Sequence, residues 1–437
     1  MIAGSGRMAG MPRFVAEVDH NEYLPVGGQV VDAILTVTAS GPDLRDPGTV
    51  PTAAQVIMID TSGSMAMPPT KLAEAKRATA VAIDTLREGV AFAVVSGSAV
   101  ARMVYPAHPA MVPANAQTRP AAKAAVAGLW ADGGTAIGRW LDLANWLFAS
   151  CPTEVRHAIL LTDGRNEHER PEDLRRVLAA CEGRFVCDSR GIGSGWVAGE
   201  LRTVASALLG TADGLEHPAQ LPAAFQAMTA AAMGKRVADV ALRIWTPAGA
   251  TVRMVKQVFP HVADLTARRS TVSARIGDYP TGAWGAETRE YHLSVVLQPD
   301  AVGEEVLAAR VSLVSAGQLL TERLVLARWT DDTALSTRIS PQVAHYTGQA
   351  ELAAAIQEGL RARETGDVET ATARLGRAVQ LAAESGHDET AMLLGRVVDV
   401  VDAPTGTVRL KRQVSALDAE LTDVRSVKTV RVKKEQE

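Results

Sequence analysis

The chain has 437 residues, of which 47% are hydrophobic and 22% charged, a composition typical of globular proteins that excludes wholesale disorder and collagen-like repeats. Its formal net charge of −4 argues against a chain that binds nucleic acid through overall positive charge. No segment has the run of about 18 strongly apolar residues that a membrane span needs, and the N-terminal stretch lacks the apolar region of a secretory signal. The three cysteines have no metal-binding spacing, and together these features predict a cytoplasmic protein without a membrane span.

Residues 13–52 predict the first strands of an antiparallel β-sandwich. Apolar residues alternate with others from Phe14 onward, a Gly-Gly turn follows, and a second alternating run covers residues 29–39. Alternation returns over residues 236–330, where several strand-like runs are separated by Pro and Gly turns. Because a lone two-stranded hairpin is marginal in water, we expect both segments to form one sandwich.

Residues 53–235 have a different pattern, in which short and wholly apolar runs alternate with helical segments. This order is typical of an α/β fold with a parallel sheet that helices cover on both faces. We therefore expect an α/β domain that is inserted in the chain between the two parts of the β-sandwich.

The C-terminal residues predict helices followed by a tail. Residues 341–403 carry no strand signal and predict three amphipathic helices, the last of which runs to Asp402. Residues 404–437 are polar, with eight Lys or Arg and five Asp or Glu, and predict a flexible basic tail with one short helix near residues 415–424.

Polar side chains follow the apolar strands at the points where those strands end. The run VIMIDTSGSM ends a strand at Asp60 and continues with Ser62 and Ser64. Thr135 stands in DGGTAIG, a Gly-Gly loop before a helix, and Asp163 ends the strand in AILLTDG. Open α/β sheets bind ligands at the carboxyl ends of their strands, so we expect these five residues to gather at one edge. Their hard oxygen atoms suit Mg²⁺ or Mn²⁺ rather than zinc or copper.

These three motifs, in this order and spacing, resemble the von Willebrand factor type A (VWA) domain and its metal-ion-dependent adhesion site. The resemblance covers about residues 53–234 and implies a Rossmann-like fold for this part of the chain. One departure is the segment 66–69, AMPP, where the family more usually has a Met-x-Gly-x-Lys run. The flanking sandwich and helices resemble those of cytosolic bacterial members of the family.

The resemblance implies a binding site rather than a reaction. The hydroxyls of Ser62, Ser64 and Thr135 would ligate a divalent cation, Mg²⁺ or alternatively Mn²⁺ or Ca²⁺, directly or through water. Asp60 and Asp163 would act mainly through waters and hydrogen bonds to those hydroxyls. Such a cation keeps much of its positive charge, so an Asp or Glu of a protein partner can complete its coordination. By analogy, the partner would be an AAA+-type ATPase or a signalling protein.

We therefore predict a non-enzymatic adaptor or scaffold for metal-dependent protein–protein interaction. Two alternatives stay open: a metal-dependent hydrolase with Asp60 or Asp163 as its base, and a structural scaffold that needs no metal. The sequence contains no P-loop motif and no Gly-x-Ser-x-Gly elbow.

One further charged segment lies close to the predicted site. The loop after Asp163 contains Glu167, His168 and Glu169, which have the composition of a solvated surface loop. We prefer that interpretation to a role in selecting the partner.

Overall fold

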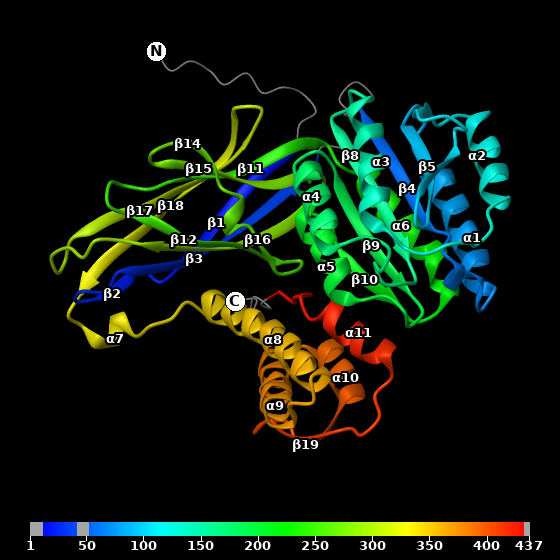
Figure 1. The fold of residues 1–437 in the computed structure, drawn as a ribbon. Coiled ribbons are helices and arrows are strands. Elements are labelled where there is room, and N and C mark those ends of the chain that lie inside the picture. The colour runs from blue at the N-terminus through cyan, green and yellow to red at the C-terminus, as the bar shows by residue number, and fades with distance from the viewer. Residues whose placement is uncertain (1–11, 42–51, 432–437) are drawn as a thin grey trace, which may run out of the picture. The chain divides into compact units, whose positions relative to one another are not determined.

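The computed structural model describes residues 12–41 and 52–431. These residues form two compact units. Figure 1 shows the chain coloured by residue number. The sandwich unit takes its described residues from Met1–Pro51, Gly234–Ala350 and Lys428–Glu437, and the α/β unit consists of Thr52–Met233 and Glu351–Val427. No helix within the described ranges is long and apolar enough to cross a membrane.

The α/β unit contains a seven-stranded sheet in the order β10-β9-β8-β4-β5-β6, with β7 also paired to β5. The strands from β10 to β5 are parallel, whereas β6 and β7 pair with β5 in the antiparallel direction. Every residue of the central strand β4 is buried, as expected for a sheet covered on both faces. The strands are β4 Ala53–Asp60, β5 Ala91–Gly97, β6 Ala101–Tyr105, β7 Val112–Pro113, β8 Val155–Thr162, β9 Val186–Ile192 and β10 Ala212–Leu215.

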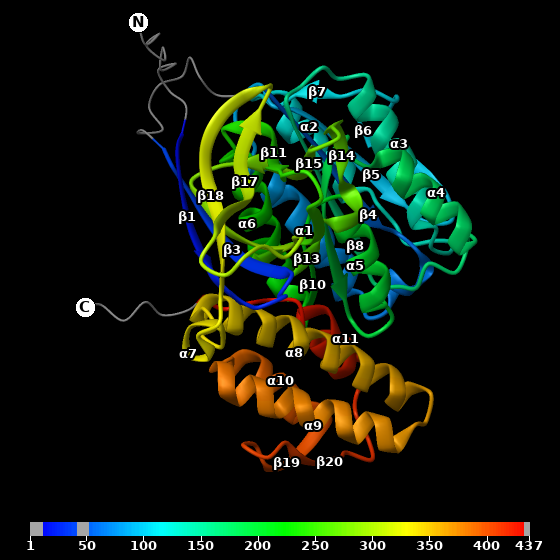
Figure 2. The same ribbon diagram turned by 90° about the vertical axis from the view of Figure 1, so that its left-hand side faces the viewer.

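Two groups of helices pack around this sheet (Figures 1 and 2). Helix α1 packs against α2 and α6, and helix α4 packs against α3 and α5. On α3 the buried residues Trp140, Leu141, Ala144, Leu147 and Phe148 recur at intervals of three and four, which places them on one face. The helices are α1 Thr70–Thr85, α2 Thr118–Ala127, α3 Ile137–Ala149, α4 Pro171–Cys181, α5 Ala198–Ala207 and α6 Leu221–Met233. The predicted α/β architecture is confirmed.

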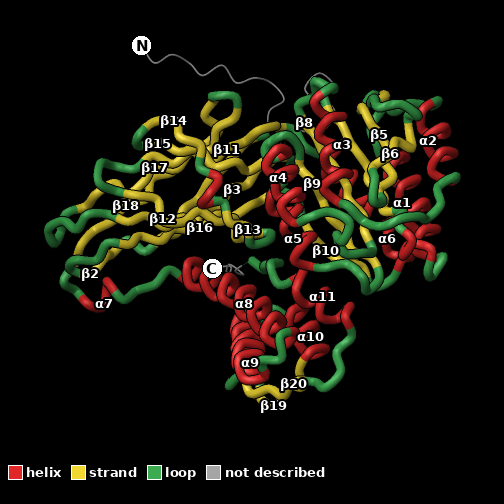
Figure 3. Tube along the Cα trace, viewed as in Figure 1, coloured by secondary structure: helices red, strands yellow, loops and turns green. Residues whose placement is uncertain are grey.

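The sandwich unit contains two largely antiparallel sheets, drawn in yellow in Figure 3. Their orders are β1-β3-β16-β12-β13 and β14-β15-β11-β17-β18-β2. Phe14 on β1 and Trp284 on β15 meet edge to face across the two sheets, with ring centroids 5.6 Å apart. The strands are β1 Arg13–His20, β2 Tyr23–Pro25, β3 Val30–Ser40, β11 Val237–Trp245, β12 Thr251–Phe259, β13 Ala263–Asp264, β14 Ser270–Ser273, β15 Ile276–Trp284, β16 Glu287–Val296, β17 Glu305–Ser315 and β18 Gln318–Thr330.

Strands from both ends of the chain share these sheets. The early strand β3 pairs from Val30 to Ala39 with the late strand β16, and β2 pairs with β18. The α/β domain is thus inserted in the chain between strands of the same sheets, as the sequence predicts.

The C-terminal region consists of helices and one small hairpin. Its elements are α7 Thr333–Ser336, α8 Pro341–Glu364, α9 Val368–Ser385, α10 Asp388–Val397, β19 Val398–Asp402, β20 Thr407–Leu410 and α11 Ala416–Arg425. The prediction that the third helix continues to Asp402 is wrong. Val398, Val400 and Val401 are β-branched residues that favour a strand, and Gly406, with φ of 67°, allows the turn back into β20.

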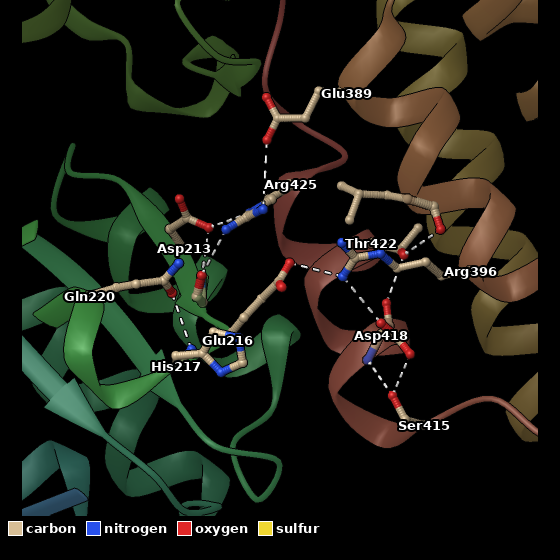
Figure 4. A network of polar contacts seen from close by, with 12 residues as sticks. Asp213, Glu216, His217, Gln220, Glu389, Arg396, Ser415, Asp418, Thr422 and Arg425 are labelled. Carbon is tan, nitrogen blue, oxygen red and sulfur yellow. Dashed lines mark hydrogen bonds and ion pairs between the residues drawn. The ribbon is translucent and has the colours of Figure 1, made fainter. Parts of the chain in front are cut away.

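The described part of residues 404–437 also differs from the predicted flexible tail. The short helix α11 forms as expected, but its side chains Leu421 and Val424 are fully buried in the core of the α/β unit. Arg425 pairs with Asp213 on β10 at 2.8 Å, as Figure 4 shows. This segment is therefore part of a folded core through Val427, and residues 432–437 lie outside the described part.

Candidate metal centre

The candidate site lies at the carboxyl edge of the parallel sheet. Strand β4 ends at Asp60, and its neighbour β8 ends at Thr162, directly before Asp163. Thr135 stands two residues before the first residue of α3. Ser62 and Ser64 follow β4, so all five residues that the sequence singled out lie at this edge of the sheet.

Two backbone hydrogen bonds join the loop after β4 to the loop before α3. The amide of Gly63 donates to the carbonyl of Gly133 at 2.8 Å, and the amide of Asp132 donates to the carbonyl of Thr61 at 2.6 Å. Gly133 has a φ of 80°, a conformation that side-chain-bearing residues rarely adopt. The glycine therefore lets the Thr135 loop pass close to the serine loop.

The hydroxyl groups lie close together, and one of them donates to Asp163. The Oγ atoms of Ser62 and Ser64 are 3.0 Å apart, and Ser64 Oγ donates to Asp163 Oδ1 at 2.6 Å. A Cβ atom on Gly164 would lie 3.2 Å from Thr135 Oγ1 and 3.7 Å from Ser64 Oγ, which places both hydroxyls beside the same residue. The structure thus brings together the five predicted residues.

The Asp60 carboxylate accepts hydrogen bonds from the loop after β4 and from the end of β8. Its Oδ1 accepts from the Ser62 amide at 2.8 Å, and its Oδ2 accepts from the Thr162 hydroxyl at 2.6 Å and from the Asp163 amide at 3.3 Å. The side chain is fully buried, and burial raises the pKa of Asp60 to about 6. Its place and bonds suit a carboxylate that orients the hydroxyl-bearing loops.

Sequence reasoning missed Lys71, the second residue of α1. Its Nζ lies 2.6 Å from Asp163 Oδ2 and 3.4 Å from the carbonyl oxygen of Ser64. The Asp163 side chain is inaccessible to solvent, and that of Lys71 is only 13% exposed. The sequence signal was available, because Lys71 is the first basic residue after the serine motif and opens a helix at the ligand edge.

The donor set fits a hard cation. Within the described residues no group of three or more His, Cys, Asp or Glu side chains is placed to hold a metal ion. The candidate centre instead combines the three hydroxyls of Ser62, Ser64 and Thr135 with two carboxylates. A hydroxyl that donates one hydrogen bond still has lone pairs for a cation, and such neutral oxygen atoms match the preference of Mg²⁺ and Mn²⁺.

The fold and the site together define a class of protein, the von Willebrand factor type A proteins. Residues 54–213 match the model of the von Willebrand factor type A domain, and residues 380–426 match that of the von Willebrand factor type A C-terminal domain. The chain is 51% identical to von Willebrand factor type A from Catenulispora acidiphila, over 97% of this chain and 98% of that one, with a TM-score of 0.92. The chain therefore belongs to the von Willebrand factor type A family.

Other similar proteins have lower sequence identity to this chain or match less of it. The ArnB paralog VWA2 from Sulfolobus acidocaldarius is 14% identical with a TM-score of 0.57, over 95% of this chain and 100% of that one, which shows a common fold. An uncharacterized protein from Synechocystis sp. is 30% identical over 234 residues, or 52% of this chain. The chain spans about half the length of that curated relative, 53%.

Proposed function

We propose that this protein binds a divalent cation, foremost Mg²⁺, and uses it to bind an acidic side chain of a protein partner. The carrying observation is the convergence of Ser62, Ser64 and Asp163, with Oγ to Oγ at 3.0 Å and Oγ to carboxylate at 2.6 Å. The hydroxyls of Ser62, Ser64 and Thr135 would hold the cation. When bound, the cation would supply a positive charge and a coordination position for an Asp or Glu of the partner.

The hydrogen bonds of the two carboxylates favour binding over hydrolysis. Both oxygens of Asp60 accept from protein donors, and those of Asp163 accept from Ser64 and Lys71. A general base must lie within reach of the proton that it removes, and the Asp60 and Asp163 side chains are both buried. Carboxylates held in this way support a non-enzymatic adaptor, with the bacterial cytoplasm as the proposed setting and an AAA+-type ATPase or signalling protein as the proposed partner class.

Two exposed apolar side chains stand on the loops of the candidate centre. Met67, three residues after Ser64, is 72% exposed, and Trp130, five residues before Thr135, is 69% exposed. Large apolar side chains at the surface are common anchors of protein–protein interfaces. They support a protein partner with apolar groups beside its acidic residue.

The proposal is tested by replacing one ligating hydroxyl. Ser62→Ala is expected to weaken Mg²⁺ and Mn²⁺ binding in calorimetry at least tenfold, because a buried oxygen donor is lost. Thr372→Ala, which removes an exposed hydroxyl on α9, serves as the control and should bind as the wild type does. Equal binding by wild type and Ser62→Ala would refute the site.

The same variants separate the candidate functions. A partner captured from native lysate with Mg²⁺ should be released by EDTA and should not bind Ser62→Ala. Trp130→Ala should weaken this capture while cation binding stays unchanged. Capture that EDTA does not affect would favour the metal-independent scaffold, and phosphate-ester or peptide turnover lost in Asp163→Ala would favour the hydrolase.

The raised pKa of Asp60 predicts how cation binding depends on pH. In the metal-free protein this carboxyl takes up a proton as the pH falls through about 6, whereas the ionised form is the one that would support a cation. Binding then releases a proton, so affinity should fall below about pH 6 by up to about tenfold per pH unit. Calorimetry on both sides of that pH measures the slope. An affinity that stays constant down to about pH 5 would show that Asp60 keeps its charge without the metal.

The same shift has the opposite effect on the stability of the metal-free protein. Because the folded state binds this proton more tightly than the unfolded chain does, the contribution of Asp60 rises as the pH falls through about 6 toward the usual carboxyl value. Thermal unfolding in EDTA checks this sign against Asp60→Asn, in which the dependence should be lost.

A further inference from the structure

The segment that carries Thr135 is held by the loop that follows Asp163. The amide of Thr135 donates to Nδ1 of His168 at 3.1 Å, and the amide of His168 donates back to the carbonyl of Thr135 at 2.9 Å. Thr135 is 4% exposed, whereas His168 lies at the surface. The backbone position of one proposed ligand is thus fixed by an exposed side chain from a different loop.

The same loop caps helix α3, which begins just after Thr135. The first amides of a helix have no partner within the helix. The N-cap residue of α3 is Ala136, whose side chain cannot accept a hydrogen bond from these amides. Instead the Ile137 amide donates to Asn166 Oδ1 at 2.8 Å, and the Gly138 amide donates to Glu169 Oε1 at 2.7 Å. Asn166 Nδ2 also donates to Glu169 Oε1 at 2.6 Å, which couples the two caps.

Two glycines of the GGTAIG motif make this approach possible. A Cβ atom on Gly134 would lie 2.1 to 2.2 Å from ring atoms of His168. A Cβ atom on Gly138 would lie 2.6 Å from Glu169 Oε2. Either contact would be much shorter than van der Waals distance. The two glycines therefore leave room for the side chains of the loop after Asp163, in the same motif that carries the Thr135 hydroxyl.

The loop is itself anchored, which corrects its interpretation as a solvated segment. The Asn166 amide donates to Glu200 Oε2 on α5 at 3.0 Å. Asn166 and Glu169 are half-buried, and only Glu167 and His168 are exposed. The four side chains of residues 166–169 are all polar, which is why the composition predicts a loop exposed to solvent. Three of them nevertheless accept hydrogen bonds from amides of residues 135–138.

We propose that Asn166, His168 and Glu169 form a positioning loop that holds the Thr135 hydroxyl in place for the cation, and that this loop sets the affinity of the centre. The inference rests on the proposed function, since it concerns the same site. A ligand that is already oriented loses less freedom when the cation arrives, and groups that support metal ligands typically change affinity by about 10- to 100-fold.

Cation affinity tests the proposal through matched variants. Asn166→Ala combined with His168→Leu should weaken Mn²⁺ and Mg²⁺ binding in calorimetry by about 10- to 100-fold. His168→Asn should restore most of the loss caused by His168→Leu, because its amide oxygen can take the place of Nδ1. Glu167→Gln removes a charge from the same loop without touching a cap, and it should bind as the wild type does.

A second measurement needs no metal. Hydrogen–deuterium exchange in EDTA should be faster at the amides of residues 135–138 in the double variant and near wild-type in His168→Asn. Unchanged exchange or unchanged affinity in a folded double variant would overturn the positioning role alone. Failure of the wild type to bind either cation would overturn the proposed function and this inference together.

Discussion

Replacement of Lys71 with methionine is expected to destabilise the metal-free protein by about 3 kcal/mol and to raise its affinity for Mg²⁺ about tenfold. Removal of the ammonium leaves the Asp163 carboxylate, which solvent does not reach, without its partner at 2.6 Å. Breaking a buried ion pair from one side usually costs about 3–5 kcal/mol, and the small exposure of Lys71 argues for the lower end. Methionine keeps most of the apolar stem, so the packing of α1 should survive.

The gain in affinity has an electrostatic cause. In the structure the ammonium satisfies Asp163 Oδ2 and lies 3.4 Å from the Ser64 carbonyl oxygen, beside the hydroxyls that would hold the cation. A positive charge beside the proposed ligands repels a divalent cation, and its removal lowers the repulsion. The protein without metal should therefore become less stable, while the stabilisation gained from Mg²⁺ becomes larger.

Two measurements on Lys71→Met test the expected loss of stability and the expected gain in Mg²⁺ affinity. Thermal unfolding in EDTA reports the loss of stability, and calorimetry reports the affinity. Lys123→Met is the control, because Lys123 pairs with Asp84 at 2.8 Å in a well-exposed pair and should change either quantity little. If Lys71→Met instead binds Mg²⁺ more weakly, the ammonium orients Asp163 for the cation and does not compete with it.

The site residues themselves were predictable because their placement follows from topology. Asp60 ends one apolar strand and Asp163 directly follows another, and parallel strands bring their carboxyl ends to one edge whatever the details of packing. Lys71 could be noticed as the first basic residue after the serine motif, but its contact with Asp163 could not be predicted in the same way. Its contact depends on where α1 begins after residues 67–69, which lie between a short 3-10 helix and α1, and tertiary packing determines that start.

The positioning loop shows a similar limit. Asn166 and Glu169 cap a helix that begins about thirty residues earlier in the chain, and no local pattern pairs a cap with so distant a helix. The glycines at 134 and 138 could be recognised as unusual from the sequence, but not the side chains that approach them.

The C-terminal tail was misjudged for a compositional reason. Residues 404–437 are rich in charge, and average polarity predicts flexibility. Yet Leu417, Leu421 and Val424 recur at intervals of four and three, the period of a helix with one apolar face. Three apolar residues are enough to hold the helix when they pack against an apolar surface of the domain, here beside β10 and α5.

Figure 4 shows that polar contacts also link this region to the strand β10 and the residues after it. Arg425 pairs with Asp213 at 2.8 Å, and Arg396 pairs with Glu216 at 2.8 Å and with Asp418 at 3.3 Å. The two Arg396 pairs are partly exposed, and such surface pairs usually contribute at most about 1 kcal/mol each, whereas the Arg425 pair is more buried. We therefore expect the apolar contacts of α11 to dominate its attachment.

Leu421→Ala is accordingly expected to destabilise the α/β unit by about 3 kcal/mol. The Leu421 side chain is fully buried, and its Cδ2 lies 2.8 Å from where a Cβ atom on Gly214 would stand, next to the indole of Trp196. Truncation leaves a cavity that the rigid indole and the strand cannot fill, which adds to the lost apolar burial. For a unit of this size the loss corresponds to a fall in Tm of roughly 6–12 °C.

The controls separate apolar packing from the rest of the C-terminal region. Met392→Ala removes a side chain on α10 that is 66% exposed, and Arg396→Ala removes two partly exposed ion pairs. Met392→Ala should lower the Tm by no more than about 3 °C, and Arg396→Ala, whose two pairs contribute at most about 2 kcal/mol together, should lower it less than Leu421→Ala does. A Leu421→Ala protein that unfolds at the wild-type temperature would show that α11 is not part of this core. A Tm lowered by the amount expected here would instead mean that the polar, charged C-terminal segment folds with the domain that carries the candidate metal centre.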